Sequence, residues 1–211
     1  MIELYTFGTP NGRKVPIMLE EVGLAYSVHP VNLGANEQFD PKFLAISPNN
    51  KIPAIVDTEG QGGRLTLFES GAILIYLAEK TGKLFAPSGA ARYKALEWLN
   101  WQTGGLAPML GQLGFFALRS TEKAPLAIQR FTEEGERLFG VLERRLADVP
   151  YLAGAEYSIA DVAAYPWCFA ATTFLAPVLG ERLAALPNFQ RWLKLIGERP
   201  AVQRGMAVPK S

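Results

Sequence analysis

The segment Thr9-Pro10-Asn11-Gly12 carries two side chains that could bind an anionic group at the start of a helix. The Thr9 hydroxyl and the Asn11 amide either cap that helix or donate hydrogen bonds to a thiolate. A thiol with an ordinary pKa near 8.5 is mostly protonated at pH 7, and lowering the pKa by one unit needs about 1.4 kcal/mol of preference for the anion. One or two hydrogen bonds to a charged acceptor, at about 1.5–3 kcal/mol each, supply that preference.

The pair Glu69-Ser70 lies at the expected junction of a strand and a helix. In the simpler interpretation it only caps the helix, with a favourable negative charge beside the helix dipole. Alternatively, the unpaired N–H groups and the Ser70 hydroxyl bind a carboxylate, while Glu69 accepts from an ammonium group beside it. A carboxylate and an ammonium on one carbon describe the end of an α-amino acid.

The pair Ile52-Pro53 begins an expected strand. A trans bond in an edge strand is the simpler interpretation, because only about 5–6% of X–Pro bonds in folded proteins are cis. A cis bond would turn the backbone N–H and C=O of Ile52 out of the sheet. There they could pair with an extended thiol peptide as if it were another strand.

The chain itself offers little reactive chemistry, since it contains one cysteine, Cys168, and one histidine, His29. These counts exclude a disulfide framework, a CxxC redox pair, a cysteine-rich zinc site and a His-x-x-x-His pair. We expect Cys168 to be a small buried hydrophobe and His29 to be exposed on a strand. Tyr5 either packs in its strand or donates to a thiolate. The reagent must therefore be bound from outside.

Composition restricts the class of protein further. A chain of 211 residues with 49% hydrophobic residues is expected to fold, and 21 basic against 20 acidic residues give no field that would gather nucleic-acid phosphates. The first residues resemble no signal peptide. The longest uncharged run, Val162 to Gly180, is interrupted by Pro166 and Pro177 and is expected to be a buried helix with its exit turn rather than a membrane span. A cytoplasmic protein without membrane contact is the resulting expectation.

The first half alternates between strand and helix patterns. Expected strands are 2–7, 25–31, 52–57 and 65–68, with a turn at 58–64, and expected helices begin near 11–13, 41 and 69. Pro16 is expected in the first turn of its helix, because a proline further inside would remove a hydrogen bond. The order β-α-β-α-β-β-α suits a small mixed sheet with helices packed on its faces.

The second half is helical throughout, after a stop and linker at 81–89. Helices are expected at about 92–116, 125–148, 159–175 and 187–198. Ser158-Ile159-Ala160-Asp161 has the form of a capping box, to which we assign a structural role. The expected domains are therefore 1–82 and an all-α domain at 90–211.

Taken together, the segments resemble the glutathione transferase superfamily over essentially the whole chain. The nearest resemblance is to its nu class, a group of disulfide-bond oxidoreductases related to the yeast nitrogen-regulation prion protein. The resemblance implies an α/β thioredoxin-like domain followed by an all-α helical bundle domain. The residues that carry it are Thr9-Pro10-Asn11-Gly12, Gln38-Phe39, Ser47-Pro48-Asn49-Asn50-Lys51-Ile52-Pro53-Ala54, Phe68-Glu69-Ser70-Gly71-Ala72-Ile73 and Ser158-Ile159-Ala160-Asp161.

The resemblance implies a glutathione site. Its cysteinyl part would pair with the backbone of Ile52, whose bond to Pro53 would be cis. Glu69 and Ser70 would hold the γ-glutamyl end. Gln38 and Lys51 would reach the polar groups of the glycyl end or of the peptide.

The resemblance also implies how the sulfur would be held. Thr9 and Asn11 would face it, and Arg130 would contact a second glutathione moiety. No cysteine lies near the first helix, so mixed-disulfide chemistry on a protein sulfur is excluded. The tyrosine or serine donor of other classes is not evident, although Tyr5 keeps that option open.

The function implied is that of a glutathione-dependent disulfide-bond reductase, in which bound glutathione thiolate is the nucleophile and oxidised glutathione the product. The alternatives are a transferase that conjugates electrophiles or reduces peroxides, and a non-catalytic interaction module of the same fold. Glutathione, as one or two molecules or as the disulfide, and a small disulfide or electrophile are the expected ligands, with no metal. A homodimer is expected, in which the helix at 69–80 meets the helix at 92–116 of its partner.

Overall fold

The structure is a computed structural model that describes residues 1–60 and 62–209. The chain forms two compact units, one made of Met1–Pro87 together with the C-terminal segment from Arg199, the other of Ser88–Glu198. The C-terminal segment was expected in the helical domain at 90–211, of which residues 210 and 211 lie outside the described residues. It belongs instead to the first unit.

The C-terminal segment joins the first unit through helix α10 (Pro200–Met206), which packs against α1 (Pro10–Val22). A Cβ on Gly205 would lie 2.5 Å from the backbone of Ile17, so only glycine permits this approach. Arg199, just before the helix, pairs with Glu21 at 2.7 Å. These contacts join residues that are far apart in the chain, so no local sequence pattern predicts them.

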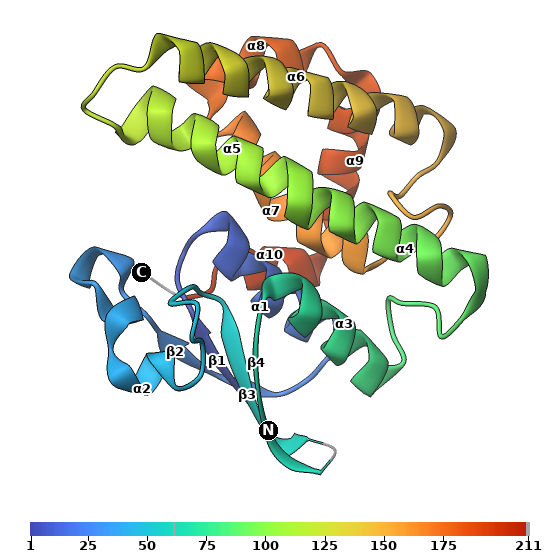
Figure 1. Ribbon diagram of the computed structural model, residues 1–211. Coiled ribbons are helices and arrows are strands. Elements are labelled where there is room, and N and C mark those ends of the chain that lie inside the picture. The colour runs from blue at the N-terminus through green and yellow to red at the C-terminus, as the bar shows by residue number, and fades with distance from the viewer. Residues whose placement is uncertain (61, 210–211) are drawn as a thin grey trace. The chain divides into compact units, whose positions relative to one another are not determined.

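The first unit is built on a four-stranded mixed sheet, as expected (Figure 1). Its strands are β1 (Ile2–Thr6), β2 (Tyr26–Pro30), β3 (Ala54–Gly60) and β4 (Gly63–Phe68), in the order β2-β1-β3-β4. β1 runs parallel to β2 and antiparallel to β3, and β3 and β4 form a hairpin. The turn of that hairpin is shorter than expected, and its residue 61 lies outside the described residues.

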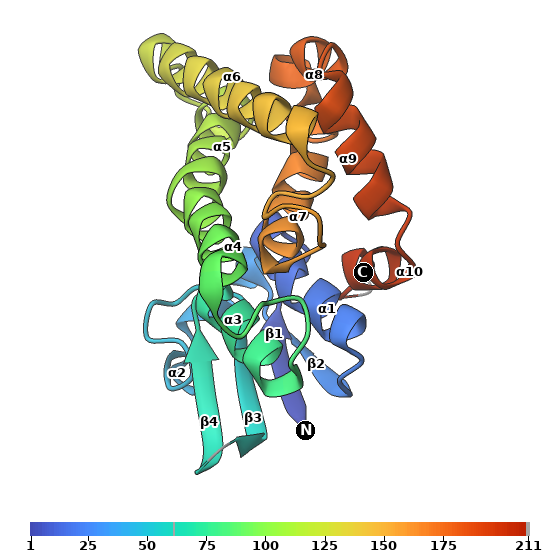
Figure 2. The ribbon, with the colours of Figure 1, turned by 90° about the vertical axis from the view of Figure 1, so that its right-hand side faces the viewer.

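Helices cover the sheet. α1 and α3 (Ser70–Thr81) pack against each other, and Figure 2 shows β3 and β4 running side by side below α3. The short helix α2 (Pro41–Leu44) follows two 3₁₀ turns, Leu33–Ala35 and Glu37–Phe39. Phe43 of α2 packs with Tyr5 of β1. The arrangement is the α/β thioredoxin-like fold that was expected.

Pro16 lies inside α1, not in its first turn, because the helix begins at Pro10. A proline at this position has no N–H for the carbonyl of Gly12, four residues earlier. The hydroxyl of buried Thr6 donates to that carbonyl at 2.9 Å instead. The expectation for Pro16 was therefore wrong, since a side chain from β1 replaces the missing helical hydrogen bond.

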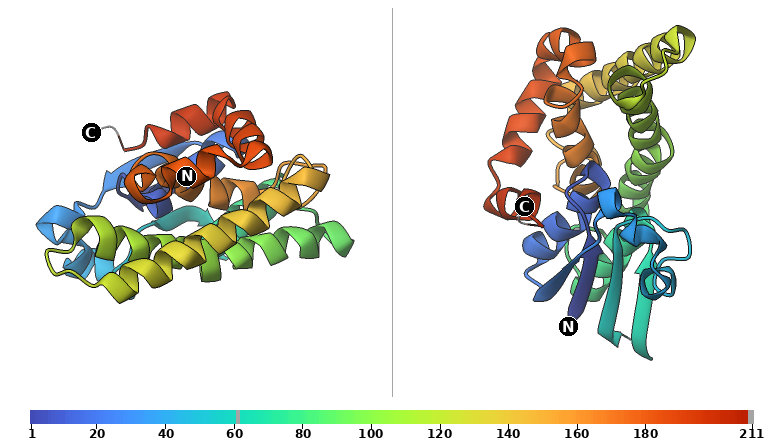
Figure 3. Two further views of the ribbon diagram at one scale, coloured as in Figure 1. Left: turned by 90° about the horizontal axis from the view of Figure 1, so that it is seen from above. Right: turned by 90° about the vertical axis from the view of Figure 1, so that its left-hand side faces the viewer.

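The second unit is built of helices, as expected, with an isolated β-bridge between Tyr151 and Gly154 in the loop before its helix at Ile159–Thr172 (Figure 3). The stretch expected at 92–116 consists of α4 (Gly89–Trp101) and α5 (Ala107–Gly114), with π-helical segments at Gln102–Leu106 and Phe115–Arg119. It is followed by α6, α7, α8 and α9, which span Pro125–Asp148, Ile159–Thr172, Ala176–Ala184 and Pro187–Gly197. The capping box before α7 is confirmed, with both of its hydrogen bonds present.

The long uncharged run forms two helices rather than one, because α7 ends at Thr172 and α8 starts with a proline in its first turn. In the described part of the chain, no single helix has the length and hydropathy for a membrane span, and the pair α7 and α8, which passes that test together, is bent by 106°.

Candidate functional site

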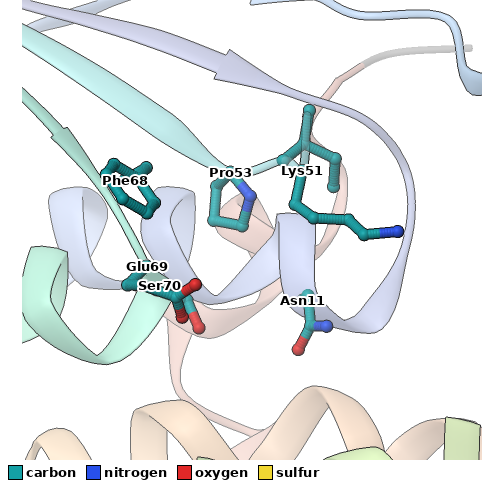
Figure 4. A pocket seen from close by; sticks show the side chains of 7 residues that line it. Asn11, Lys51, Pro53, Phe68, Glu69 and Ser70 are labelled. Atoms are coloured by element: carbon teal, nitrogen blue, oxygen red, sulfur yellow. The ribbon is translucent and has the colours of Figure 1, made fainter. Parts of the chain in front are cut away.

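A pocket of about 260 Å³ opens in the first unit, where several chain segments meet (Figure 4). It brings together the first turn of α1, the residues before β3 and the junction of β4 with α3. Six of the residues predicted from the sequence line it, and Phe68 is an addition that the sequence analysis did not single out. The lining residues are Asn11, Lys51, Ile52, Pro53, Phe68, Glu69 and Ser70.

The bond between Ile52 and Pro53 is cis, which confirms the less common of the two alternatives. β3 starts only at Ala54, where it pairs with Tyr5 and Phe68, so the backbone of Ile52 stands outside the ladder. The Ile52 side chain is 9% exposed and belongs to the apolar cluster behind the pocket. Ile52 also lines the pocket, at a position where its backbone is not part of the sheet.

A short loop holds this segment in place. The Ser47 hydroxyl is buried and donates to the Lys51 carbonyl at 2.9 Å. The Asn50 N–H donates to the Ser47 carbonyl at 2.9 Å, and Asn50 adopts φ 48°, which asparagine tolerates better than most residues. The Lys51 side chain is exposed at the rim of the pocket, where it can reach an anionic group.

The junction at Glu69 and Ser70 is not a simple side-chain cap. Glu69 occupies the N-cap position with φ 70° and ψ 110°, and its carboxylate makes no capping hydrogen bond. A non-glycine residue in that region costs on the order of 1–3 kcal/mol and tends to occur at functional sites. The first N–H groups of α3 have no partner within the helix. The pocket therefore meets a helix N-terminus suited to an anion, with a carboxylate beside it for a cation.

Lys14 lies behind this junction and was missed by the sequence analysis. Its side chain is 1% exposed, and its Nζ donates to the Ser70 Oγ at 3.4 Å. Burial lowers the pKa of Lys14 to about 7, against the opposing effect of the Glu69 charge. From the sequence alone, a lysine in the first helix is expected to be solvated. Only the packing of the folded chain shows that Lys14 is buried.

Thr9 and Asn11 stand at the N-terminus of α1. The Thr9 hydroxyl accepts from the Gly12 N–H at 3.1 Å and so caps the helix, which leaves its own hydrogen able to donate. Asn11 lines the pocket, whereas Thr9 does not. A Cβ at Gly12 would collide with the Phe7 carbonyl, so this turn requires glycine. Of the two residues predicted to face a thiolate, Asn11 therefore lines the pocket and Thr9 does not.

Gln38 and Arg130 are not among the pocket residues. Gln38 lies in the second 3₁₀ turn, and its Oε1 is buried without a hydrogen-bond partner. Arg130 is exposed on α6 of the second unit, and its charge helps Arg137 to lower the pKa of Glu134. The roles expected of Gln38 and Arg130 stay predictions.

The remaining candidates are not among the residues that line the pocket. Tyr5 stacks on His29 with ring centroids 4.8 Å apart, and burial raises the pKa of Tyr5, which disfavours the ionised form. His29 is exposed, as expected. Cys168 is completely buried, and burial raises the pKa of its thiol. A buried thiol with a raised pKa is unreactive, so the single sulfur nucleophile of the chain is unsuited to catalysis.

Comparison with known proteins identifies the family. The model described as "Glutathione S-transferase, N-terminal domain" matches residues 1–79, and "Glutathione S-transferase, C-terminal domain" matches residues 125–195. The disulfide-bond oxidoreductase YfcG of Escherichia coli is 48% identical over 208 residues, which cover 98% of this chain and 94% of YfcG. The chain belongs to the glutathione transferase family.

This glutathione transferase is also similar to solved structures of relatives with ligands bound. One, from Pseudomonas fluorescens, holds two glutathione molecules and is 46% identical, with a TM-score of 0.93 and coverage of 97% of this chain and 92% of that one. Another, from Pseudomonas putida, holds one glutathione disulfide per subunit and is 45% identical, with a TM-score of 0.94 and coverage of 99% and 91%.

The family predicted from the sequence motifs is thus confirmed, together with its enzyme class, the glutathione-dependent oxidoreductases and transferases. The residues around the pocket fit glutathione in chemical terms, since they offer a free peptide edge, an anion-binding helix terminus and a carboxylate. Within the described residues, no group of three or more His, Cys, Asp or Glu side chains could hold a metal ion.

Proposed function

We propose that this glutathione transferase reduces disulfide bonds with glutathione as the nucleophile. The observation that carries the proposal is the pocket itself, which Ile52 and Pro53 line together with Glu69 and Ser70 at the start of α3. The name of YfcG and the glutathione disulfide bound by the Pseudomonas putida relative also support it.

Glutathione binds across the pocket in an extended form. Its cysteinyl peptide groups pair with the backbone of Ile52 beside Pro53, as one strand pairs with another. Its γ-glutamyl carboxylate takes the N–H groups and hydroxyl at Ser70, and its ammonium group pairs with Glu69. Lys51 holds the glycyl carboxylate at the rim of the pocket.

Three further residues complete the proposed site. The Thr9 hydroxyl and the Asn11 amide donate to the sulfur and lower the pKa of the bound thiol. Gln38 contacts the glycyl part of the peptide, a role that rests on the family resemblance. Arg130 contacts a second glutathione, a role that rests on the family resemblance alone.

The reaction then takes two displacements. The bound glutathione thiolate attacks one sulfur of a disulfide, forms a mixed disulfide and releases a thiolate, which takes up a proton. A second glutathione thiolate attacks the glutathione sulfur of the mixed disulfide and releases the other thiol. Two glutathione molecules and one disulfide give one glutathione disulfide and two thiols. The protein contributes positioning and stabilisation of the anion.

The test is glutathione-dependent reduction of 2-hydroxyethyl disulfide by the Cys168→Ala variant. We expect turnover within about twofold of the unmodified chain, because the buried thiol takes no part. Abolished turnover in a variant with an unchanged melting temperature would mean that a protein sulfur participates.

Conjugation of glutathione to electrophiles uses the same thiolate, and the relatives of known structure are named glutathione transferases. Relative rates with 2-hydroxyethyl disulfide and an aryl halide separate the two activities. We expect the disulfide to react faster. The converse order would make conjugation the main reaction, and calorimetry without any glutathione binding would favour a non-catalytic module.

A further inference from the structure

Lys14 stands directly behind the proposed γ-glutamyl site. It lies one helical turn after Asn11 on α1, and its Nζ is 3.4 Å from the Ser70 Oγ. Asn11 and Ser70 both line the pocket. Lys14 therefore links two walls of the pocket, α1 and the start of α3, from the inside.

A lysine in this environment needs an explanation. Its side chain is 1% exposed and follows α1 into the core, where Val15 and Met18 are completely buried. Lysine is almost never fully buried, because an ammonium group loses hydration that few partners replace. A methionine would fill the same space without that loss. Packing alone therefore does not explain why an amine is present at this position.

Several charged groups on the elements that pack against α1 are engaged in ion pairs of their own. On α1, Glu20 and Glu21 pair with Arg204 and Arg199 of the α10 segment. Glu3 on β1 pairs with Arg64 of β4, and Lys80 on α3 pairs with Asp57 of β3. Two further charged residues on these elements are Arg13 on α1 and Glu79 on α3. The charge of Glu69 acts on Lys14 and favours its protonated form.

We propose that Lys14 is a positioning residue whose amine takes up a proton when the α-carboxylate of a γ-glutamyl ligand binds at Ser70. This inference rests on the proposed glutathione site. The ammonium form of Lys14 then donates to Ser70 from behind while the ligand carboxylate approaches Ser70 from the pocket. Binding of the ligand carboxylate thus brings a positive charge on Lys14 that the unoccupied site mostly lacks.

The sign of the proton transfer follows from the charges. Burial lowers the pKa of the free amine to about 7, so at pH 7.5 only about a quarter of the molecules carry the charge. A ligand carboxylate at Ser70 favours the charged form and raises this pKa. The ligand ammonium acts in the opposite direction but is drawn to Glu69. A rise of about 1.5 units would leave about nine-tenths of the amines protonated, an uptake of roughly 0.7 proton.

The experiment is titration calorimetry with S-methylglutathione at pH 7.5, in two buffers of different ionisation enthalpy. The methylated sulfur cannot ionise, so proton release by a thiol does not mask the uptake. The difference in apparent binding enthalpy between the buffers gives the number of protons exchanged. We expect uptake of roughly half a proton or more at pH 7.5 and close to none at pH 5.5, where the free amine is already charged.

Variants assign the proton to Lys14. In Lys14→Met the uptake should disappear, whereas Lys83→Met, which removes a lysine that donates to the Val22 carbonyl at the other end of α1, should retain it. His29→Gln should also retain it and excludes the one histidine of the chain. The assignment is also supported if Lys14→Met folds but no longer binds S-methylglutathione, while the unmodified chain takes up protons when it binds this ligand.

Two results would overturn the inference. S-methylglutathione that binds without proton uptake, or uptake that persists in Lys14→Met, shows that Lys14 does not have this role while the glutathione site stands. No binding of S-methylglutathione or of glutathione removes the proposed site itself, and the inference with it.

Discussion

Two features that destabilise the folded chain occur at the junction of β4 and α3. Glu69 adopts a backbone conformation that non-glycine residues avoid, and Lys14 is buried beneath its neighbour Ser70. A non-glycine residue in this conformation and a fully buried lysine are both uncommon in folded proteins. Because both features lie at the wall of one pocket, we expect this junction to bind a charged ligand.

At the same scale, Asn11→Ala should lower glutathione-dependent disulfide reduction about 10- to 100-fold at pH 7, since a hydrogen bond to a charged acceptor contributes about 1.5–3 kcal/mol. With one donor fewer the thiolate is less favoured, so the pKa of bound glutathione rises toward that of the free thiol and part of the activity returns at higher pH. The ultraviolet absorbance of the thiolate, titrated with bound glutathione, measures this pKa.

Asn49→Ala is the matched control, because Asn49 carries the same amide on the exposed part of the loop before Lys51. It should leave both activity and the pKa of the bound thiol unchanged. An Asn11→Ala variant whose bound glutathione titrates as in the unmodified chain would remove Asn11 from the proposed mechanism.

Among the elements, the start of α7 combines a local signal with distant partners. Asp161 accepts from the backbone N–H of Ser158, which is one of the two hydrogen bonds of the capping box, and from the Ser158 hydroxyl, and both distances are 3.1 Å. It also accepts from the Leu152 N–H and the Trp192 indole N–H, at 2.9 Å each. One buried carboxylate thus joins the helix to the preceding loop and to α9, which a capping box alone would not do.

Asp161→Ala should therefore lower the free energy of unfolding by about 3 kcal/mol, because it leaves several buried donors without an acceptor. Thermal unfolding followed by circular dichroism measures the loss. Asp148→Ala, at the exposed end of α6, removes an acidic side chain without such partners and should change stability little. Altered disulfide reductase activity in Asp161→Ala at an unchanged melting temperature would contradict the structural role.

On the scale of the whole molecule, we propose that the chain forms a homodimer through α3 and α4. Tyr93 is 70% exposed on α4, the helix that is expected to meet α3 of the partner. Sedimentation equilibrium should give about twice the chain mass of 23.1 kDa.

Tyr93→Glu should weaken the dimer, since a charge at the centre of an interface loses its hydration. Leu126→Glu, at an 81% exposed position on α6, is the control that should leave the mass unchanged. A monomer mass for the unmodified chain at micromolar concentration would refute the proposed assembly.

Local sequence was sufficient for the features whose determinants lie within a few residues of one another. Thr9 caps α1 through Gly12, Ser158 and Asp161 start α7, and strand and helix periodicity predicts the order of the first unit. The family motifs added the cis bond at Pro53, which periodicity alone left as the less common alternative. Such features follow from backbone preferences and side chains close along the chain.

Tertiary structure alone decided the features that depend on residues far apart in the chain. Thr6 satisfies the carbonyl that Pro16 leaves open, α10 joins the first unit through Gly205, and Lys14 meets Ser70, 56 positions away. Burial and electrostatic environment are properties of packing, and a linear sequence shows neither. The polypeptide sequence therefore determined which chemical groups are present, and only folding decided which of them are desolvated and charged, because hydration is lost where distant segments come together.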